Sequence, residues 1–249
     1  MKKQNAYTLI ETAIAIIIIT IIISMIGVGN YLYSQYQLRT VINENAYYKA
    51  AITTFISQYG QLPGDFNKAS TIWPNCDATP ANCNGNSNGI INREYTFQYT
   101  DEALRAWQHL YFARLIDQQM SGYHNPIKQN TIGINVPASK FPGAGWFIDD
   151  YAPTELSRYY NVITLGASIA GDINRNFILT ATQVQTIDQK VDDGLPLSGK
   201  VKGSRSDLAG GGFWNGAAVG TGCALSATNT YNTATAYQKV INCIISFTI

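Results

Sequence analysis

An apolar run near the N-terminus constrains what this chain can fold into more than any other feature does. The run extends from Thr12 to Gly29, is dominated by isoleucine and follows directly after a carboxylate, Glu11. A helix over residues 7–29 would be about 35 Å long at ~1.5 Å per residue, and the hydrocarbon core of a bilayer is about 30 Å thick. The sequence therefore predicts a membrane-spanning helix at this end of the chain.

The order of segments around this run differs from that of an ordinary secretory signal. Such a signal is cut after its hydrophobic region, so the mature protein loses the apolar part. Here the small residue, Ala6, comes before the apolar run. A cut after Ala6 would remove only the leader with Lys2 and Lys3, and the mature chain would keep the whole helix. The two lysines also predict a cytoplasmic leader, with the bulk of the chain outside.

Glu11 is the charged side chain that this helix has to accommodate. A carboxylate at depth in a membrane costs at least a few kcal/mol. One interpretation places Glu11 near the headgroups, in the first helical turn, where its charge suits the helix dipole. The other gives it a cation as partner. After a cut behind Ala6 the nearest candidate is the new amine of Tyr7, on the same chain or on a neighbouring one.

The segment Ala6-Tyr7-Thr8-Leu9-Ile10-Glu11, with the apolar run behind it, resembles the class III signal of type IV pilins and type II secretion pseudopilins. In that family a prepilin peptidase cuts between a small and an aromatic residue and N-methylates the new terminus. A glutamate stands fifth in the mature chain. The family usually has glycine and phenylalanine where this chain has Ala6 and Tyr7. The resemblance implies cleavage between these two residues, methylation of Tyr7, and a role for Glu11 in setting the register between subunits.

The same resemblance implies a fold, a location and partners. The fold class would be α+β, with a long N-terminal helix packed on a small antiparallel-sheet head that carries one or two extra helices. The chain would be a single-pass protein of a bacterial inner membrane with a periplasmic head, and later part of a periplasmic or extracellular filament. Its partners would be membrane lipid, prepilin peptidase, an inner-membrane assembly platform and other pilin-like subunits.

The residues after the apolar run predict that the helix continues into the head. No proline occurs between Tyr31 and Tyr59, and apolar residues recur at steps of three and four, which indicates an amphipathic helix. This stripe consists of Leu38, Val41, Ile42, Tyr48, Ile52, Phe55 and Tyr59. Glu44 and Lys49 are assigned to the wetter side. Gly60, followed by Pro63-Gly64, marks the end of the helix.

These signals divide the chain into four parts. They are a cleaved leader (1–6), a transmembrane or filament-core helix (7–29), the amphipathic second half of the helix (30–60) and an extracytoplasmic globular head (61–249). A plain membrane anchor followed by a linker is the alternative. A solvated linker would not keep an apolar stripe, so the sequence favours one continuous helix.

Composition favours an extracytoplasmic protein without a nucleic-acid partner. The formal net charge is +1 and charged residues make up 13% of the chain, which gives no electrostatic case for nucleic acid or anionic lipid. The even number of cysteines, Cys76, Cys83, Cys223 and Cys243, is typical of disulfides in an oxidising compartment. We expect pairing in sequence order, although three connectivities are possible. A zinc site is the rival interpretation.

Turn and periodicity signals predict the elements of the head. Gln61–Asn67 is a turn, and its Leu-Pro-Gly-Asp sequence resembles a segment of many pilin-like proteins of Gram-negative bacteria. Residues 73–89 form an Asn- and Gly-rich loop; its side-chain oxygens offer calcium ligands, but no acidic residue stands at EF-hand spacing. A helix is expected over Asp101–Ile116 with Thr100 as its cap. Strands are expected at residues 145–148, 162–165, 177–179 and 240–249.

The densest acidic cluster is Asp188, Asp192 and Asp193, near the end of a helix expected from about Thr182 to Gly194. Asp188 and Asp192 are four residues apart and would share a helix face. Carboxylates on one face can hold calcium. The other interpretation is a solvated helix end. No cofactor is expected, and Ca²⁺ is the one ion that the sequence leaves open.

The function expected is structural rather than enzymatic. The chain contains no P-loop, His-Glu-x-x-His or dinucleotide fingerprint, and His109 has no evident catalytic partner. We expect a subunit of a type IV pilus-like filament. A type II secretion pseudopilin or a minor pilin is favoured, because the head is larger than a simple major pilin requires. The alternative is a membrane-anchored periplasmic binding module for carbohydrate or peptide. Phe213 and Trp214 are expected to be either contacts to a subunit or substrate, or a partly buried anchor of their loop.

Overall fold

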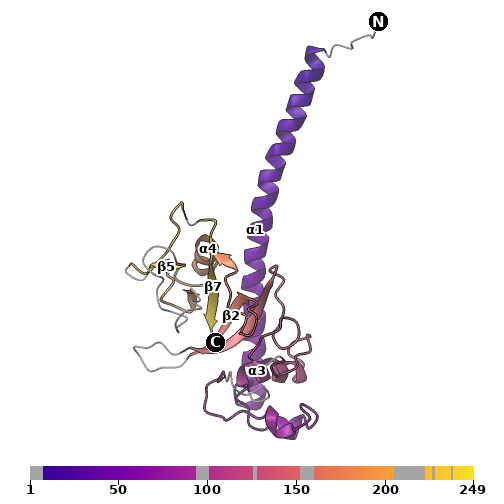
Figure 1. Cartoon of the computed structure of the whole chain (residues 1–249), viewed down its shortest axis with the longest axis vertical. Helices are drawn as coiled ribbons and strands as arrows, with labels where there is room; N and C mark the ends of the chain where they lie inside the picture. The colour runs from indigo at the N-terminus through magenta and orange to yellow at the C-terminus, as the bar shows by residue number, and fades with distance from the viewer. Residues whose placement is uncertain are drawn as a thin grey trace. The chain divides into compact units, whose positions relative to one another are not determined.

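The computed structural model describes residues 8–93, 101–125, 128–151, 160–204, 222–225, 228–236 and 238–249. The chain divides into two compact units, Met1–Arg39 and Thr40–Ile249. Figure 1 shows their elements in sequence order. The class is α+β, with a long N-terminal helix, an antiparallel sheet and further helices.

Helix α1 (Leu9–Tyr59) runs through 51 residues, as the absence of proline and the apolar stripe predicted. It ends where Gly60 takes a φ of 74°, a left-handed conformation that glycine adopts without steric cost. Within the second unit its buried residues recur at three- and four-residue steps, at Val41, Asn45, Tyr48, Ile52 and Phe55. That spacing places them on one helix face, which forms part of the core of the head.

The main sheet is antiparallel and has the last strand of the sequence in its middle. Its path is β1 (Ala144–Tyr151), β2 (Tyr160–Ala167), β7 (Ile241–Thr248) and β3 (Leu179–Thr180), and β4 (Val201–Ser204) also pairs with β7. Strand β7 thus bonds to β2, β3 and β4. Its residues from Asn242 to Phe247 are all buried, as expected for a strand covered on both faces.

The shorter elements surround this sheet. They are α2 (Ala69–Ile72), the 3-10 helix η1 (Pro80–Cys83), α3 (Glu102–Phe112), α4 (Ala181–Val191), and the small hairpin of β5 (Ala224–Leu225) and β6 (Thr230–Tyr231). Helix α3 lies against β1, whereas α4 contacts β3, β4, β6 and β7. Helix α4 begins with a capping box, in which Thr180 and Gln183 satisfy each other's backbone N–H groups.

Aromatic side chains connect the layers of the core. The ring centroid of Tyr48 lies 5.0 Å from that of Trp107 and 5.8 Å from that of Trp146. Trp146 in turn lies 6.1 Å from Phe247. These four residues belong to α1, α3, β1 and β7, so one chain of ring contacts joins four elements. The two edge-on pairs, Tyr48–Trp107 and Tyr48–Trp146, contribute about 0.5–1.5 kcal/mol each beyond the area that they bury.

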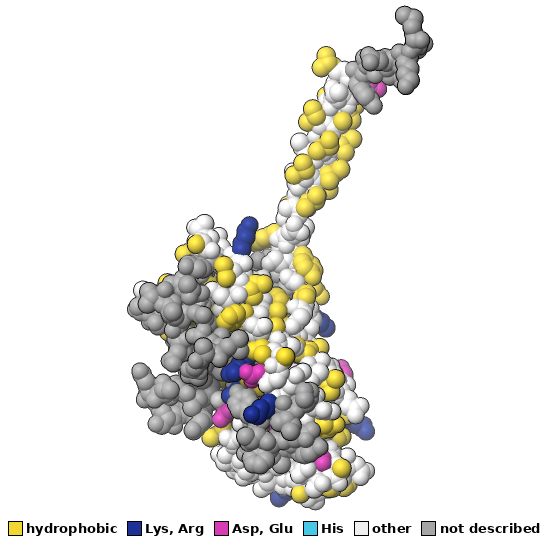
Figure 2. Space-filling view, viewed as in Figure 1, with side chains coloured by type: hydrophobic (Ala, Val, Ile, Leu, Met, Phe, Trp, Pro, Cys, Tyr) yellow, Lys and Arg dark blue, Asp and Glu magenta, His cyan; other side chains and the backbone are white. Residues whose placement is uncertain are grey.

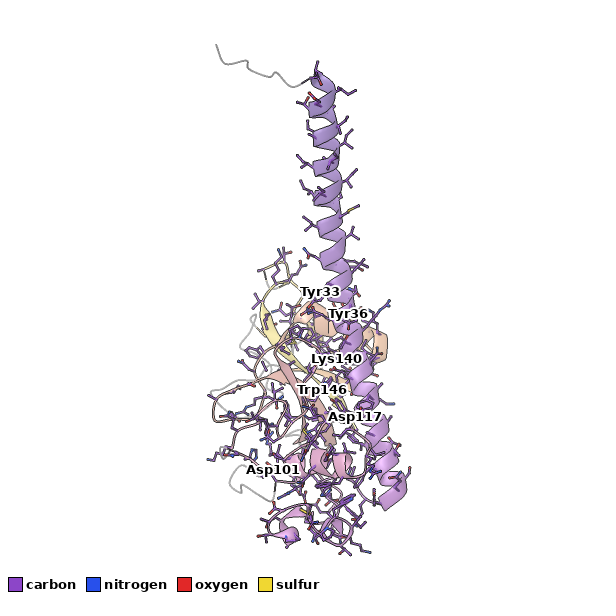
Figure 3. The ribbon with its side chains drawn as sticks, turned by 90° about the vertical axis from the view of Figure 1, so that its right-hand side faces the viewer. Tyr33, Tyr36, Asp101, Asp117, Lys140 and Trp146 are labelled. Carbon is purple, nitrogen blue, oxygen red and sulfur yellow. A yellow bond between two sulfur atoms is a disulfide. The ribbon has the colours of Figure 1, made fainter. Side chains whose placement is uncertain are left out.

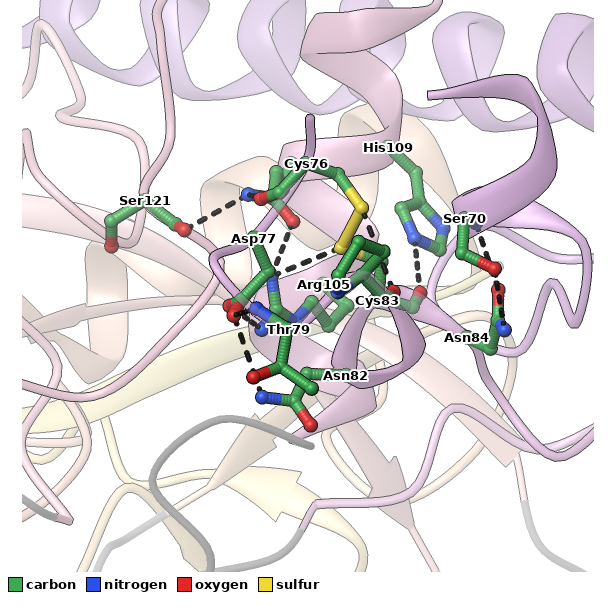
Figure 4. The surroundings of a disulfide bond; sticks show 12 residues. Ser70, Cys76, Asp77, Thr79, Asn82, Cys83, Asn84, Arg105, His109 and Ser121 are labelled. Atoms are coloured by element: carbon green, nitrogen blue, oxygen red, sulfur yellow. Dashed lines mark hydrogen bonds and ion pairs between the residues drawn. A yellow bond between two sulfur atoms is a disulfide. The ribbon is translucent and has the colours of Figure 1, made fainter. Parts of the chain in front are cut away.

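Two disulfides join Cys76 to Cys83 and Cys223 to Cys243, the pairing expected from the sequence. Figure 4 shows the first of them beside Arg105, whose Nη1 donates to Cys83 Sγ at 3.6 Å and whose Nη2 bonds to Asp77 at 2.6 Å. The second disulfide fastens the central strand β7 to the residue before the β5–β6 hairpin. All four cysteines are used in this way.

Two sequence expectations are wrong in their details. Helix α3 has Asp101 as its N-cap, with the carboxylate accepting from Ala103 N at 2.9 Å, whereas Thr100 lies outside the described residues. The helix ends at Phe112 rather than Ile116, because the chain turns at Arg114 with a φ of 59°. In the segment expected as a strand over residues 177–179, only Leu179 is in β3.

The disulfide of β7 generates a stability prediction. A closed loop with a separation of 20 residues should contribute about 3 kcal/mol, against about 2 kcal/mol for the separation of 7 residues in the Cys76–Cys83 loop. We expect the Cys223→Ala/Cys243→Ala double variant to lose more stability than Cys76→Ala/Cys83→Ala. Urea unfolding of the full chain in detergent, followed by tryptophan fluorescence, measures both. Equal losses, or a transition insensitive to reductant, would contradict this prediction.

Candidate functional site

The first functional region is the start of α1. Ala6 and Tyr7 lie outside the described residues, but Thr8 and Glu11 are described. One carboxylate oxygen of Glu11 accepts from Thr8 N at 2.7 Å and from Thr8 Oγ1 at 2.9 Å, and Glu11 N donates back to Thr8 Oγ1 at 3.4 Å. This reciprocal pattern is a capping box. Within its own chain, Glu11 therefore closes the first turn of α1, where a negative charge is favourable.

The surroundings of Glu11 in the sequence contain no cation that could pair with its charge. Neither lysine nor arginine occurs between Lys3 and Arg39. Glu11 is exposed in the structure, and so are its neighbours Leu9 and Ile10, at 90% and 68%. The carboxylate thus lies at the tip of an apolar surface with hydrogen-bond donors from Thr8 alone among the described residues.

The first part of α1 is apolar on all sides. Figure 2 shows apolar side chains along the visible face of this segment. Its exposed residues include Ile14, Ile16, Ile17, Ile18, Ile19, Ile21, Ile22, Ile23, Met25, Ile26 and Val28. The helix is long and apolar enough to cross a membrane. A shallow groove on it is lined by Ile21, Met25, Val28 and Leu32 together with the smaller residues Thr20, Ser24 and Gly29, and small residues let a second helix approach closely.

Glu44 ties the second half of α1 into the head, which the sequence did not reveal. Its carboxylate accepts from Ser139 Oγ at 2.6 Å, from Lys140 N at 2.8 Å and from Trp146 Nε1 at 2.8 Å; Figure 3 labels the last two partners. The expectation that Glu44 and Lys49 face water is wrong, because both are partly buried and Lys49 Nζ donates to Thr248 O at 2.7 Å. Their partners lie roughly a hundred residues or more along the chain, where no local pattern could indicate them.

The Leu-Pro-Gly-Asp turn organises the Asn-rich loop. Asp65 is buried and accepts from Asn88 N at 2.9 Å and Gly89 N at 2.8 Å. Gly64 takes a φ of 85°, and a Cβ there would overlap the backbone oxygen of Glu102. The side-chain oxygens of Asn86 and Asn88 each accept from a backbone N–H two residues later. These oxygens are therefore used as turn formers, in agreement with the turn interpretation of this loop.

The two histidines are packed into the head. His109 is fully buried, accepts at Nδ1 from Gly64 N at 2.9 Å and lies with Nε2 at 2.9 Å from Cys83 O. Burial lowers the pKa of His109 to about 3, the Cys83 carbonyl opposes this shift, and the charge of Arg105 adds to it. His109 is therefore a neutral side chain that connects the turn at Gly64 to the first disulfide.

His124 forms a buried pair with Asp101, at 2.7 Å between Nε2 and Oδ2. Burial alone would lower the pKa of His124, but the hydrogen bond and the charge of Asp101 outweigh it and raise the pKa. Asp101 also caps α3. The pair thus links the residues near His124 to the start of that helix. Neither histidine has a serine, threonine or cysteine nucleophile among its hydrogen-bond partners in the described residues.

The structure brings Asp188, Asp192 and Asp193 together at the end of α4, with one oxygen of each within 4.8 Å of the others. Asp192 is the C-cap of the helix rather than a residue of its last turn. Burial and the charges of Asp193 and Asp192 raise the pKa of Asp188 to about 6, against the lowering effect of the Tyr231 hydroxyl. Phe213 and Trp214, the aromatic contact candidates, lie outside the described residues.

Comparison with known proteins identifies the N-terminal segment. The family model of the prokaryotic N-terminal methylation motif matches residues 1–27. The chain therefore carries the prepilin-type signal, which is typical of type IV pilins and pseudopilins, and these are structural proteins processed by prepilin peptidase. No curated protein and no solved structure matches the chain.

The buried neutral state of His109 has a consequence for acid stability. Its folded pKa of about 3 lies below the unfolded value of ~6.5, so the unfolded chain binds more protons between these values. The stabilisation is present above pH ~6.5 and is lost as the pH falls toward 3. In His109→Gln, whose amide can serve the same two partners, we expect the loss of stability between pH 7 and pH 4 to be smaller by up to about 3 kcal/mol.

Urea unfolding of both proteins at the two pH values measures this difference. His124→Gln is the matched control, because the raised pKa of His124 stabilises the fold at low pH. That variant should lose more stability on acidification than the parent chain. Parallel pH profiles for the parent chain and His109→Gln would show that His109 does not titrate as described.

Proposed function

We propose that this chain is a subunit of a type IV pilus-like filament, cut between Ala6 and Tyr7 and assembled from the inner membrane. The observation that carries the proposal is the prepilin-type signal over residues 1–27, fused to the helix α1 that continues into the core of a head. The four parts proposed are the leader (1–6), the transmembrane or filament-core helix (7–29), the amphipathic half (30–60) and the head (61–249).

The apolar part of α1 supports assembly as well as anchoring. A helix that is hydrophobic all round must be covered by lipid or by other protein. In a membrane, lipid covers it; in a filament, the same surface of neighbouring subunits does. The groove with Thr20, Ser24 and Gly29 gives a second helix a place to approach closely. Transfer from lipid to a helix bundle then exchanges one apolar environment for another at little hydrophobic cost.

Register between subunits requires a directional contact, because apolar packing alone allows sliding. We assign this contact to Glu11 and the amine of Tyr7 on a neighbouring subunit. In the isolated chain Glu11 accepts hydrogen bonds from Thr8, so its charge is solvated locally but not neutralised. Processing creates a positive terminus, and a pair between the two charges removes most of the cost of burying each in an apolar core.

Within the filament systems we place the chain as a type II secretion pseudopilin or a minor pilin. The supporting feature is the elaborate head: a five-stranded sheet, a separate hairpin, two helices of eleven residues each and two disulfides. Deletion of the chain followed by secretion assays and imaging of surface fibres separates the roles. Loss of secretion with normal fibres indicates the pseudopilus, whereas shortened or absent fibres indicate a pilus.

The mass of the mature N-terminus tests the processing step. We expect the protein isolated from its membrane to begin with N-methylated Tyr7, because the small–aromatic pair precedes a matched methylation motif. Mass spectrometry of the N-terminal peptide gives the answer directly. An intact Met1 would favour the alternative, a membrane-anchored periplasmic binding module that never enters a filament.

A substitution at Glu11 tests the registry contact. Glu11→Ala should leave the chain inserted, processed and folded, but reduce its incorporation into filaments more than tenfold. Removal of one partner of a buried pair costs about 3–5 kcal/mol, and 1.4 kcal/mol is tenfold. Ser57→Ala is the control, because Ser57 is exposed, lies outside the apolar groove, donates to Thr53 O of its own helix and carries no charge. Normal incorporation of Glu11→Ala would refute the registry role.

A further inference from the structure

The end of α4 gathers three carboxylates on the head. Asp188 lies in the last turn of the helix, Asp192 is its C-cap and Asp193 follows in the turn. One oxygen atom of each lies within 4.8 Å of the other two. Three like charges at this separation repel one another, so the arrangement is unfavourable unless something of opposite charge joins it.

The inner carboxylate has an unused oxygen. Asp188 has an exposed fraction of 0%. Its Oδ2 accepts from the Tyr231 hydroxyl at 2.7 Å, whereas its Oδ1 is buried and has no hydrogen-bond partner among the residues that the structure describes. The backbone N–H of Gly194 also interacts favourably with this carboxylate. A buried carboxylate oxygen without a donor is costly, and it is the group that a cation would satisfy.

The carboxylates of Asp192 and Asp193 accept hydrogen bonds from backbone and side-chain groups of the same chain. Asp192 Oδ2 accepts from the backbone N–H groups of Lys200 and Val201. Asp193 accepts from Leu195 N at 2.9 Å and from Ser198 Oγ at 2.7 Å. Such supporting hydrogen bonds orient ligand groups without blocking all of their lone pairs. The residues that follow Asp193, up to Val201, therefore fix the positions of these two carboxylates.

Gly199 lets this loop come close enough. It has a φ of 66°, and a Cβ at this position would overlap the Asp192 carboxylate. Only glycine combines that conformation with that approach. The residues from Leu195 to Lys200 thus wrap around the two outer aspartates, and the site is a formed cradle rather than a chance meeting of exposed acids.

Three lysines near the cluster, Lys49, Lys200 and Lys202, do not neutralise it by direct pairing. Lys202 on β4 is the cation on which all three aspartates act. Lys200 lies in the loop, and Lys49 is engaged with Thr248 O at 2.7 Å. In the described part of the chain none of these lysines forms an ion pair with Asp188, Asp192 or Asp193. The cluster therefore retains a net attraction for a small cation.

We propose that Asp188, Asp192 and Asp193 bind a hard divalent cation, Ca²⁺, at the end of α4. Ca²⁺ takes six to eight oxygen ligands, including carboxylates and waters. The partly buried Asp192 and the exposed Asp193 leave a solvent side for the waters. The donor set contains only oxygen, which disfavours zinc and other metals that prefer nitrogen or sulfur. The ion would join α4, the loop before β4 and, through Tyr231, the hairpin strand β6.

This inference does not depend on the filament role, and its test uses the full chain in detergent. Three carboxylates open to solvent suggest a Kd of about 10⁻⁴–10⁻³ M, the range of extracellular modules. At a Ca²⁺ concentration about tenfold above Kd, the melting temperature should rise by about 3–5 °C over that in EDTA. Terbium, which replaces calcium, should show luminescence excited through tyrosine, because the Tyr231 hydroxyl touches Asp188.

Asp192→Asn and Asp193→Asn should each weaken Ca²⁺ and terbium binding at least tenfold and abolish the thermal shift. Both side chains reach the surface, so these variants should fold. Asp172→Asn is the matched control, because Asp172 pairs with Arg175 elsewhere on the head, and it should bind as the parent does. Binding unchanged in both cluster variants, or no thermal shift in the parent chain, would overturn the proposal.

Discussion

The structure depends on one helix, α1, whose first part is suited to an apolar environment and whose second part packs in the head. The first part of α1 is apolar on every side, so water cannot be its solvent. The second part has one buried face, marked by Val41, Ile52 and Phe55, and an opposite polar face. In the sequence, the boundary between the two parts of the helix is the point where an unbroken apolar run changes to apolar residues spaced three to four residues apart.

Carboxylates that accept backbone N–H groups fix the loops of the head. Glu44 holds Lys140 N, Asp65 holds the N–H groups of Asn88 and Gly89, and Glu102 holds those of Asn86 and Asn92 at 2.8 and 2.9 Å. In each case a charged acceptor, which makes stronger hydrogen bonds than a neutral one, orders a segment without regular structure. A head with 13% charged residues thus uses several of its acids internally rather than as a solvated surface.

The sequence predicts the long helix and the main strands because their signals are local. Periodicity, the absence of proline and the Gly60 stop depend on neighbouring residues, and so do the strand signals at residues 145–148, 162–165 and 240–249. The partners of Glu44 and Asp188 are different. Trp146 lies 102 residues from Glu44, and Tyr231 lies 43 residues from Asp188. Burial of these acids follows from tertiary packing, and local patterns do not encode it.

The short elements were missed for a related reason. Strands β4, β5 and β6 have four, two and two residues, too few to show alternation. The sequence alone favours Thr100 as the cap of α3, because Asp101 can also begin the helix and both residue types cap helices well. The spacing of Asp188 and Asp192 indicated a shared face, but the contribution of Asp193 depends on the turn geometry after the helix end.

The position of β7 in the sheet has a consequence for biogenesis. Strands β2, β3 and β4 all require this strand as their neighbour, and it is synthesised after all three. The edges of β2, β3 and β4 that pair with β7 therefore stay unpaired until translation has passed residue 248. A chain truncated before β7 lacks the centre of the sheet and also lacks Cys243, so the thiol of Cys223 is left without its disulfide partner.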